Sequence, residues 1–549
     1  MPLARLGRGW PVLLAVLFAL VGITWGLPGS DTWAEDAMSP RTCGLFGIAE
    51  TYAPGHFHAY PPLHVALLTL TSLPWELRTI LRVGFDRAAL EQALIAPRVM
   101  TPIELCARLV AVAMLAGIVW NTVRLFERLG GRRVGIVAGL VVATNSALIY
   151  YAHTGALEVP YLFWSSWALV EIDRVLAGES REPQVMIAVT CAVLTKDQAA
   201  GLFLLTLPAC LAVRPALLRS KRTWLSLGGA LVAYALVAGA VTNPSGFAKR
   251  IALLLGPMAS DWTPYPKTLA GYGAMARDAI AAVPLQASWP IAIAAAVGVV
   301  VVLRERRGLD RARAVMPLVA AASYKLVFLL GARRTEDRFL LPLAILSFPY
   351  AAFALEAWLA RARSAVLPYA AFAVALAPAL LAVASVDATL LADPRYAAER
   401  FLASLPAGTR VEVYGGSHFI PRIPAQIDAV RISLDDPAAR SHAYRVTDVQ
   451  GDPNAIDLRH PGYVVLGAEH SHLFPPGYAP TARFGTVEFT DAATFRFFYA
   501  LTTGQLDYAP VLKARCELPW PLSCRDIHGS TAHDVWIYRR QSPEKPATE

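Results

Sequence analysis

The sequence predicts an α-helical polytopic membrane protein with an α/β domain outside the membrane at its C-terminal end. Of its 549 residues, 55% are hydrophobic and only 17% are charged. The apolar residues form blocks of about 20, the length that crosses a bilayer as a helix. Beyond position 386 the pattern changes to an amphipathic helix and short apolar strands separated by Pro and Gly. We therefore expect a membrane domain over 1–386 and an extracytoplasmic α/β domain over 387–549.

The first apolar block, residues 9–27, follows two arginines as a signal peptide would. Its apolar core is long for a secretory signal, and no Ala-x-Ala cleavage site follows, so we predict a retained first helix. With this helix the expected spans number about eleven, and the pair between 184 and 213 is short for full crossings. The further spans are 103–123, 133–150, 158–177, 184–195, 198–213, 223–242, 287–303, 314–331, 338–358 and 365–386.

Basic residues of the short connections predict the orientation. Clusters of Arg and Lys fall on alternate connections, at 124–133, 214–222, 304–313 and 361–363. The positive-inside rule places these connections and the N-terminus in the cytoplasm, and an odd number of helices places the C-terminus outside. Topology thus explains most of the excess of 50 basic over 41 acidic residues, without a nucleic-acid partner. We expect a multi-pass protein of the bacterial inner membrane with a periplasmic C-terminal domain.

The first outer loop, residues 28–102, is too long for a simple connector. It opens with PGSDTWAEDAMSPR, which contains Asp31, Glu35 and Asp36, and continues into HFHAYPPLH. The apolar stretch 61–73 is too short to span the membrane, so we expect an interfacial or re-entrant helix. That helix would hold the acids near the membrane surface, where a carboxylate is costly unless a substrate uses it.

Several cations lie where positive charge is normally depleted. The segment GARRTEDRFLLP falls on a predicted outer connection, the turn TKDQ falls on another, and one Lys lies inside an apolar span. An Arg can bond two phosphate oxygens at once, and a Lys at membrane depth is a functional candidate. The alternative is that Arg333 and Arg334 are neutralised by Glu336 and Asp337 or extend to lipid headgroups. The candidate phosphate ligands are Arg333, Arg334, Arg338, Lys196 and Lys325.

The cysteines and histidines give weaker signals. Cys516 and Cys524 close a short loop in an oxidising compartment, so a disulfide is plausible. No cofactor is certain. His56 and His58, with His64 nearby, could contribute to a divalent metal site, although packing or headgroup contact is the commoner role of such residues. Trp33 could stack on a sugar ring or anchor the loop at the interface.

Short motifs in a fixed order resemble a known family. They are WAED (33–36), YPPLH (60–64), YYAHTGALEVPYLFW (150–164), TKDQ (195–198), RFLLP (338–342) and DPRYAAERFLASLPAGTRV (393–411). Together they are similar to the membrane glycosyltransferases that use polyprenyl-phosphate sugars, the family 39-like group that includes protein O-mannosyltransferases and the lipid A aminoarabinose transferase. The resemblance implies a C-type glycosyltransferase (GT-C) fold, a polyprenyl-phosphate-linked sugar as donor, and a lipid, glycan or protein as acceptor.

The resemblance also implies roles for individual residues. A catalytic acid in the first outer loop maps onto Asp36, with Asp31 as the alternative, and the usual partner acid is either displaced to Glu35 or missing. Glu158 matches an acid that shapes the acceptor side, although its place at a helix N-terminus is an equally good explanation. Relatives carry a Lys before the Pro pair where this chain has Tyr60, so Lys196 or His64 is expected to substitute. Tyr60, His64 and Trp33 are expected to line the site.

Three other classes remain as alternatives. A secondary transporter would show corresponding interrupted helices in two halves, and the sequence has no such repeat. A non-enzymatic membrane scaffold would tolerate the loop acids as solvated residues. A transferase of the O-antigen ligase type would also use lipid-linked sugars, but it would depend on an Arg and a His in a large late loop, whereas here the acidic loop comes first.

Overall fold

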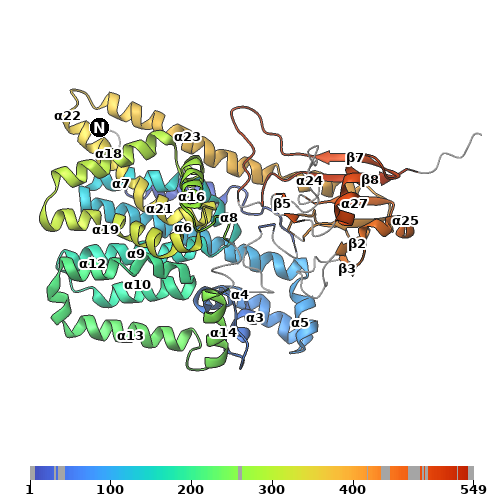
Figure 1. Ribbon diagram of the computed structural model, residues 1–549, viewed down its shortest axis with the longest axis horizontal. Helices are drawn as coiled ribbons and strands as arrows, with labels where there is room; N and C mark the ends of the chain where they lie inside the picture. Colours follow the sequence, from blue (N-terminus) through green and yellow to red (C-terminus); the bar gives the residue numbers. More distant parts are fainter. Residues whose placement is uncertain are drawn as a thin grey trace, which may run out of the picture. The chain divides into compact units, whose positions relative to one another are not determined.

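The computed structural model describes residues 7–29, 33–34, 44–256, 263–416, 418–433, 446–467, 483–484, 487–488, 492–527 and 530–541. The chain divides into two compact units, which are described separately below (Figure 1). The helical unit comprises 1–23, 38–84 and 102–387. The C-terminal unit comprises 388–549 together with 24–37 and 85–101 of the first outer loop.

The helical unit is built from α-helices joined by short connections. Its first half contains α1 (Trp10–Leu20), α3 (Leu45–Tyr52), α4 (Pro62–Val83), most of α6 (Pro97–Gly130), α7 (Arg132–Ala143), α8 (Ser146–Thr154), α9 (Glu158–Leu176), α10 (Glu182–Thr195), α11 (Ala200–Phe203) and α12 (Thr206–Val213). Its second half contains α13 (Lys221–Val237), α14 (Pro244–Leu255), α16 (Leu269–Ala281), α17 (Val283–Gln286), α18 (Trp289–Glu305), α19 (Gly308–Tyr324), α20 (Leu330–Ala332), α21 (Asp337–Ser347), α22 (Ala351–Arg361) and α23 (Val366–Leu391).

Long apolar helices confirm the expected class of membrane protein, whereas the expected count of about eleven spans is not confirmed. In the described part of the chain, four helices are long and apolar enough to cross a bilayer, or five with the bent pair α7 and α8. The four are Pro97–Gly130, Gly308–Ala332, Asp337–Arg361 and Val366–Ala403. Several of the other expected spans form shorter helices, since α13 and α18 have 17 residues each and α10 has 14.

The bend between α7 and α8 has a local cause. The two helices meet at 62°. The Asn145 side chain accepts a hydrogen bond from the Leu148 backbone N–H at 2.8 Å, so it caps a new helix instead of continuing the old one. Gly155 ends α8 in the left-handed region, at φ 68°, where its missing side chain also admits Ala107. α8 therefore stops just before Glu158, the first residue of α9.

The helix α4 is longer than the sequence predicts. The apolar stretch 61–73 is a helix, as expected, but it continues through Pro74 to Val83. The continuation buries Glu76 and Thr79, which lie at helical spacing on the face of the buried Ser72, while charged residues such as Arg78 and Arg82 are exposed. The extra turns are amphipathic and not apolar. A prediction based on a continuous run of apolar residues therefore ends the helix too early.

The C-terminal unit contains the α/β domain that the sequence predicts. Its six-stranded sheet has the order β3-β2-β1-β4-β8-β7. The strands β1 to β4 are parallel to one another, whereas β8 pairs antiparallel with both β4 and β7. The strands are β1 (Arg410–Tyr414), β2 (Asp428–Ser433), β3 (Val446–Gln450), β4 (Tyr463–Leu466), β7 (Tyr508–Ala514) and β8 (Val535–Arg540), with a separate pair of β5 (Arg483–Phe484) and β6 (Val487–Glu488).

Alternate residues along the strands pack into two separate hydrophobic cores, one on each face of the sheet. Val411 and Val413 of β1 pack in a core that contains Leu402 of α24 (Pro394–Ala403), whereas Tyr414 packs in one that contains Phe498 of α27 (Ala492–Thr502). A period of two is what a sheet covered on both faces requires. The short helix α25 (Ile456–Arg459) precedes β4, and α5 (Arg87–Leu94) is contributed by the first outer loop. The expected disulfide between Cys516 and Cys524 is present.

Candidate functional site

The helical unit gathers an acid, a cation and aromatic hydroxyl groups where α8 ends, α9 begins and α10 ends. Glu158 is the first residue of α9 and is 1% exposed. Lys196 follows α10 directly, and its Nζ forms an ion pair with Oε1 of Glu158. The same Nζ lies 6.0 Å from the centre of the Tyr161 ring. Two residues that the sequence nominated separately, Glu158 and Lys196, therefore belong to one site.

Three more polar side chains join this ion pair from other helices. The Tyr151 hydroxyl of α8 donates to Oδ1 of Asp337, the first residue of α21, at 3.0 Å. Tyr151 and Tyr324, the last residue of α19, both lie close enough to Glu158 to interact with its charge. All of these side chains except that of Lys196 belong to buried residues. We call this group the Glu158 cluster: Tyr151, Glu158, Tyr161, Lys196, Tyr324 and Asp337.

Two of the predicted phosphate ligands adjoin the Glu158 cluster through aromatic rings. The guanidinium groups of Arg334 and Arg338 lie 5.3 and 4.9 Å from the ring centre of Phe339. That ring is 5.9 Å from Phe328, which is in turn 5.2 Å from Tyr324 of the cluster. Such cation–π contacts hold a guanidinium in place without neutralising it. Arg334 and Arg338 are both partly exposed.

The acids around these arginines are arranged differently from the simple neutralisation considered for the sequence. Glu336 accepts a hydrogen bond from Nε of Arg338 at 3.0 Å. The donor of this bond is thus neither Arg333 nor Arg334. Arg333 instead donates to the backbone oxygen of Tyr265 and to Oγ1 of Thr263, the latter at 2.9 Å. Arg333 is 8% exposed and adopts a left-handed φ of 49°. It holds the segment of Thr263 and Tyr265 before α16 to the end of α20, which is a structural role.

Lys325 occupies a distinct backbone feature. Residues Lys325–Leu329 form a π-helical turn between α19 and α20, and the Lys325 side chain is exposed. π-bulges inside helices occur frequently at functional sites. Lys325 also follows Tyr324 of the Glu158 cluster, so it places an accessible cation on the same segment.

The part of the first outer loop that belongs to the helical unit is anchored by one asparagine. Asn243 is 2% exposed, and its Nδ2 lies 3.0, 2.8 and 2.8 Å from the backbone oxygens of Thr51, Ala53 and His56. Its Oδ1 accepts from the Gly55 N–H at 3.0 Å. Sequence reasoning did not single out Asn243, although an Asn before a Pro at a helix start is a recognisable capping signal. This anchor fixes the segment that leads to Tyr60.

The residues expected to line the site from this loop have mixed surroundings. Tyr60 is partly exposed and packs against a core of Val65, Leu68 and neighbouring residues, while its backbone N–H lies 3.2 Å from Nδ1 of His58. His64 is 1% exposed, and neither ring nitrogen has a hydrogen-bond partner among the described residues. Burial lowers the pKa of His64 to about 3, so its ring is neutral at physiological pH.

The metal and sugar-stacking hypotheses concern His56, His58 and Trp33. Within these ranges, no group of three or more His, Cys, Asp or Glu side chains is placed to hold a metal ion, and this includes His56 and His58. Trp33 lies in the C-terminal unit and is 2% exposed. Its ring is covered by Tyr396, at 5.1 Å between ring centres, and by the guanidinium of Arg395 at 4.3 Å. The ring is thus part of a core.

The acids of the first loop, Asp31, Glu35 and Asp36, lie outside the residues that the structure describes. A further acid of the same loop was missed in the sequence. Glu76 of α4 is 1% exposed and accepts a hydrogen bond from the Ser72 hydroxyl. Burial raises the pKa of the Glu76 carboxyl. Its signal, a Ser and a Glu four residues apart, appears only when α4 is continued beyond position 73.

Comparison with known proteins gives structural neighbours but no sequence relatives. No family model matches the sequence, and no curated protein matches it significantly. The chain is similar to ArnT from Cupriavidus metallidurans bound to undecaprenyl phosphate, with 13% identity, coverage of 97% of this chain and 98% of that one, and a TM-score of 0.47. It is also similar to the archaeal oligosaccharyltransferase AglB from Archaeoglobus fulgidus in complex with an inhibitory peptide and a dolichol-phosphate, with 10% identity, 97% and 88% coverage, and a TM-score of 0.42.

A third neighbour is the mycobacterial arabinofuranosyltransferase AftD, with 16% identity and a TM-score of 0.37. That match covers 98% of this chain and 42% of the longer neighbour. These neighbours are glycosyltransferases of the GT-C type, the group that the sequence motifs resemble.

Proposed function

We propose that this protein is an inverting glycosyltransferase that moves a monosaccharide from a polyprenyl-phosphate carrier to a hydroxyl group of an acceptor. The observation that carries the proposal is the Glu158 cluster with the adjoining Arg334 and Arg338. It combines acids, cations and hydroxyl groups at one end of the helical unit. Transfer from a lipid phosphate requires such a combination, because a proton must leave the acceptor while the departing phosphate gains negative charge.

Asp36 is the proposed general base, with Asp31 as the alternative and Glu35 as a supporting acid. In the reaction the acceptor oxygen attacks the anomeric carbon and passes its proton to this carboxylate. The bond between that carbon and the phosphate oxygen breaks at the same time, and polyprenyl phosphate leaves as an anion. No second acid is needed to protonate the leaving group, unlike the alkoxide of a glycosidase. Glu158 is proposed to orient the acceptor side.

The cations are proposed to stabilise the phosphate by exchanging partners. Lys196 pairs with Glu158, and Arg338 pairs with Glu336, whose side chain is 39% exposed. An arriving phosphate can replace the carboxylate at each cation, so neither cation is left uncompensated before or after binding. Arg334, which is partly exposed, and Lys325, which is exposed, are additional candidate ligands. Tyr60 is proposed to line the site.

The site is proposed to face the periplasm of a bacterial inner membrane, with the N-terminus in the cytoplasm. The basic clusters at the connections far from the Glu158 cluster, including Arg219, Lys221 and Arg222, support this orientation. A donor carried by a polyprenyl lipid would then reach the site through the outer leaflet.

Replacement of Asp36 by Asn tests the proposal. Membranes of cells that express the wild type or a variant would be assayed for lipid-linked sugars and glycosylated acceptors by mass spectrometry. We expect Asp36→Asn to reduce transfer by at least about 100-fold, because it removes the base, and the uncleaved lipid-linked sugar should accumulate. Asp310→Asn is the matched control, since Asp310 is exposed at the far end of α19. Unchanged transfer by Asp36→Asn and Asp31→Asn would refute the proposed chemistry.

A further inference from the structure

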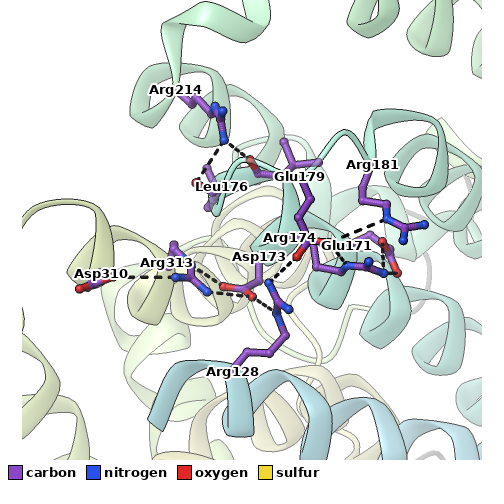
Figure 2. A network of polar contacts seen from close by, with 11 residues as sticks. Arg128, Glu171, Asp173, Arg174, Leu176, Glu179, Arg181, Arg214, Asp310 and Arg313 are labelled. Carbon is purple, nitrogen blue, oxygen red and sulfur yellow. Dashed lines mark hydrogen bonds and ion pairs between the residues drawn. The ribbon is translucent and has the colours of Figure 1, made fainter. Parts of the chain in front are cut away.

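A second polar network lies at the opposite end of α9 from the Glu158 cluster. The 19 residues of α9 place the two ends about 28 Å apart. Asp173, with a side chain 2% exposed, lies between Arg128 of α6 and Arg313 of α19 (Figure 2). Arg214, just after α12, donates to the backbone oxygens of Val175 and Leu176 at 2.5 and 3.4 Å. These bonds fix the end of α9 against three other helices.

An apolar pocket opens beside this fixed end of α9. Its walls come from α9, α10, α12 and α13, and α10 lies between α9 and α13 (Figure 1). The lining on α10 runs from Glu182 to Met186, about one helical turn or ~6 Å along the axis. The pocket is therefore shallow and close to the helix ends. Its apolar lining includes Ile172, Val175, Met186, Leu207, Leu211 and Leu227.

Three cations lie in the chain segment that forms one edge of the pocket. Arg219, Lys221 and Arg222 lie between Leu217 and Thr223, which both line the pocket, and all three are exposed. Only Arg222 has an acidic neighbour within ion-pair distance among the described residues, namely Glu182 at 3.5 Å. Lys221 and Arg222 also occupy the first turn of α13, where the helix dipole favours an anion. This edge of the pocket thus carries three cations against one lining acid, Glu182, while most of the remaining lining is apolar.

The surroundings of the pocket favour a membrane lipid over a protein partner. α13 buries none of its 17 residues, so its sides are available to hydrocarbon. Trp224 is 54% exposed, and its indole N–H donates to the Leu218 backbone oxygen at 2.8 Å. Trp at the level of the cations is typical of a membrane–water interface. A phospholipid would place its phosphate at this level and its first methylene groups in the pocket directly below.

We infer that this pocket binds one anionic phospholipid of the surrounding bilayer, with its headgroup at Arg219, Lys221 and Arg222 and the start of one acyl chain against α10 and α13. Basic pockets between membrane helices are known to select anionic headgroups. The binding site is separate from the Glu158 cluster and is not part of the proposed transfer reaction. The Asp173 network keeps the α9 wall of the pocket in place.

Retention of lipid by the full-length protein tests this inference. The protein would be equilibrated in detergent with equal amounts of phosphatidylglycerol and phosphatidylcholine, and bound lipid would be counted by native mass spectrometry. We expect one retained phosphatidylglycerol per chain with a preference of at least about tenfold, since each cation contributes about fivefold near the surface. The triple variant Arg219→Ser, Lys221→Ser, Arg222→Ser should lose the preference, and Leu227→Trp should lose the bound lipid by filling the pocket.

The pair Arg304→Ser, Arg307→Ser is the matched control, because Arg304 in the last turn of α18 and Arg307 just before α19 are both exposed and neither lines this pocket. This variant should keep the wild-type preference. Equal retention of the two lipids by the wild type, or an unchanged preference in the triple variant, would overturn the inference. Retention by a folded Leu227→Trp variant would show that the lipid is held by surface charge alone, which also overturns the pocket site. The triple variant decides the outcome if Leu227→Trp does not fold.

Discussion

The two ends of α9 carry buried carboxylates with very different partners. At one end Asp173 accepts hydrogen bonds from two arginines, Arg128 at 2.5 Å and Arg313 at 2.8 and 3.2 Å. At the other end, Lys196 is the one ion-pair partner of Glu158 among the described residues, and the hydroxyl groups of Tyr151, Tyr161 and Tyr324 lie near its charge. Both oxygens of the Asp173 carboxylate are thus occupied by structural hydrogen bonds. The Glu158 carboxylate has a partner that can be shared with an incoming phosphate.

The difference indicates how the helical unit separates stability from chemistry. Arg128 and Arg313 join α6 and α19 to α9 through the same carboxylate, so Asp173 acts as a fixed junction between helices. Elsewhere in the helical unit, the buried ring nitrogens of His64 in α4 have no hydrogen-bond partner among the described residues. Incomplete satisfaction of this kind is costly in a purely structural region and is common at functional sites.

The largest expected effect is at the Asp173 end. Asp173→Ala leaves two guanidinium groups without their shared carboxylate, so we expect the free energy of unfolding to fall by about 3 kcal/mol. That value is at the low end for a buried pair, because Arg128 and Arg313 are 30% and 18% exposed. Thermal unfolding in detergent would measure the loss. Sugar transfer per folded molecule should be unchanged, and a loss of transfer without a loss of stability would reverse the assigned roles of the two ends.

Glu158→Gln should produce the opposite pattern. The amide keeps the size of the side chain but removes the charge that holds Lys196, so we expect transfer to fall by about 100-fold, equivalent to about 2.7 kcal/mol. The change in unfolding free energy should be smaller than for Asp173→Ala, because Lys196 can reach solvent. Steady-state transfer assays beside thermal unfolding would separate the two effects. If Glu158→Gln is as active as the wild type, the ion pair has only a structural role.

His64 provides a test by pH. Its pKa in the folded protein is about 3, well below the ordinary value of 6.5. The unfolded chain therefore takes up a proton below pH 6.5 that the folded chain does not, and stability falls as the pH falls from 6.5 toward 3. Between pH 7.5 and 5.5 this linkage amounts to about 1.4 kcal/mol. Between pH 7.5 and 5.5 the free energy of unfolding of His64→Leu should therefore fall by less than that of the wild type, with a difference of this amount. An identical fall in the two proteins would contradict the burial of a neutral ring.

Glu76→Gln should have the smallest effect and the opposite sign. Burial raises the pKa of Glu76, so the wild type loses stability as the pH rises above 4.5 through the folded-state pKa. An amide at this position retains the bond with Ser72 and removes the buried charge. We expect the variant to be more stable than the wild type by about 1 kcal/mol at pH 7.5 and no more stable at pH 4. A destabilised variant at pH 7.5 would indicate that the carboxylate has a charged partner.

The sequence nominated three residues of the candidate site, Lys196, Arg338 and Glu158, but did not show that they lie near one another. Lys196 and Arg338 were found because a cation on an outer connection contradicts the positive-inside rule, and Glu158 was found by resemblance. Their proximity could not be predicted, because it depends on how α9, α10 and α21 converge. The separate role of Arg333 was also hidden, since its hydrogen bonds go to Thr263 and Tyr265, far away in the sequence.

The class of fold followed directly from composition, whereas the number of spans did not. Apolar blocks identify membrane helices well only when each helix is continuous. Here Asn145 caps a second helix within one block, and α4 continues as an amphipathic helix after its apolar part ends. Asn243 and Glu76 were missed for a related reason, because single polar residues acquire their roles only through contacts that the chain makes in three dimensions.

Binding of polyprenyl phosphate tests the central claim most directly. The affinity of the purified full-length protein for a short-chain polyprenyl phosphate would be measured by calorimetry for the wild type, Lys196→Met, Arg338→Met and Arg313→Met. We expect the first two substitutions to weaken binding by at least about tenfold, since each removes a charge-assisted contact to phosphate, and the third to leave it unchanged. Unaltered binding in Lys196→Met and Arg338→Met, or an equal loss in Arg313→Met, would contradict a phosphate site at the Glu158 end of α9.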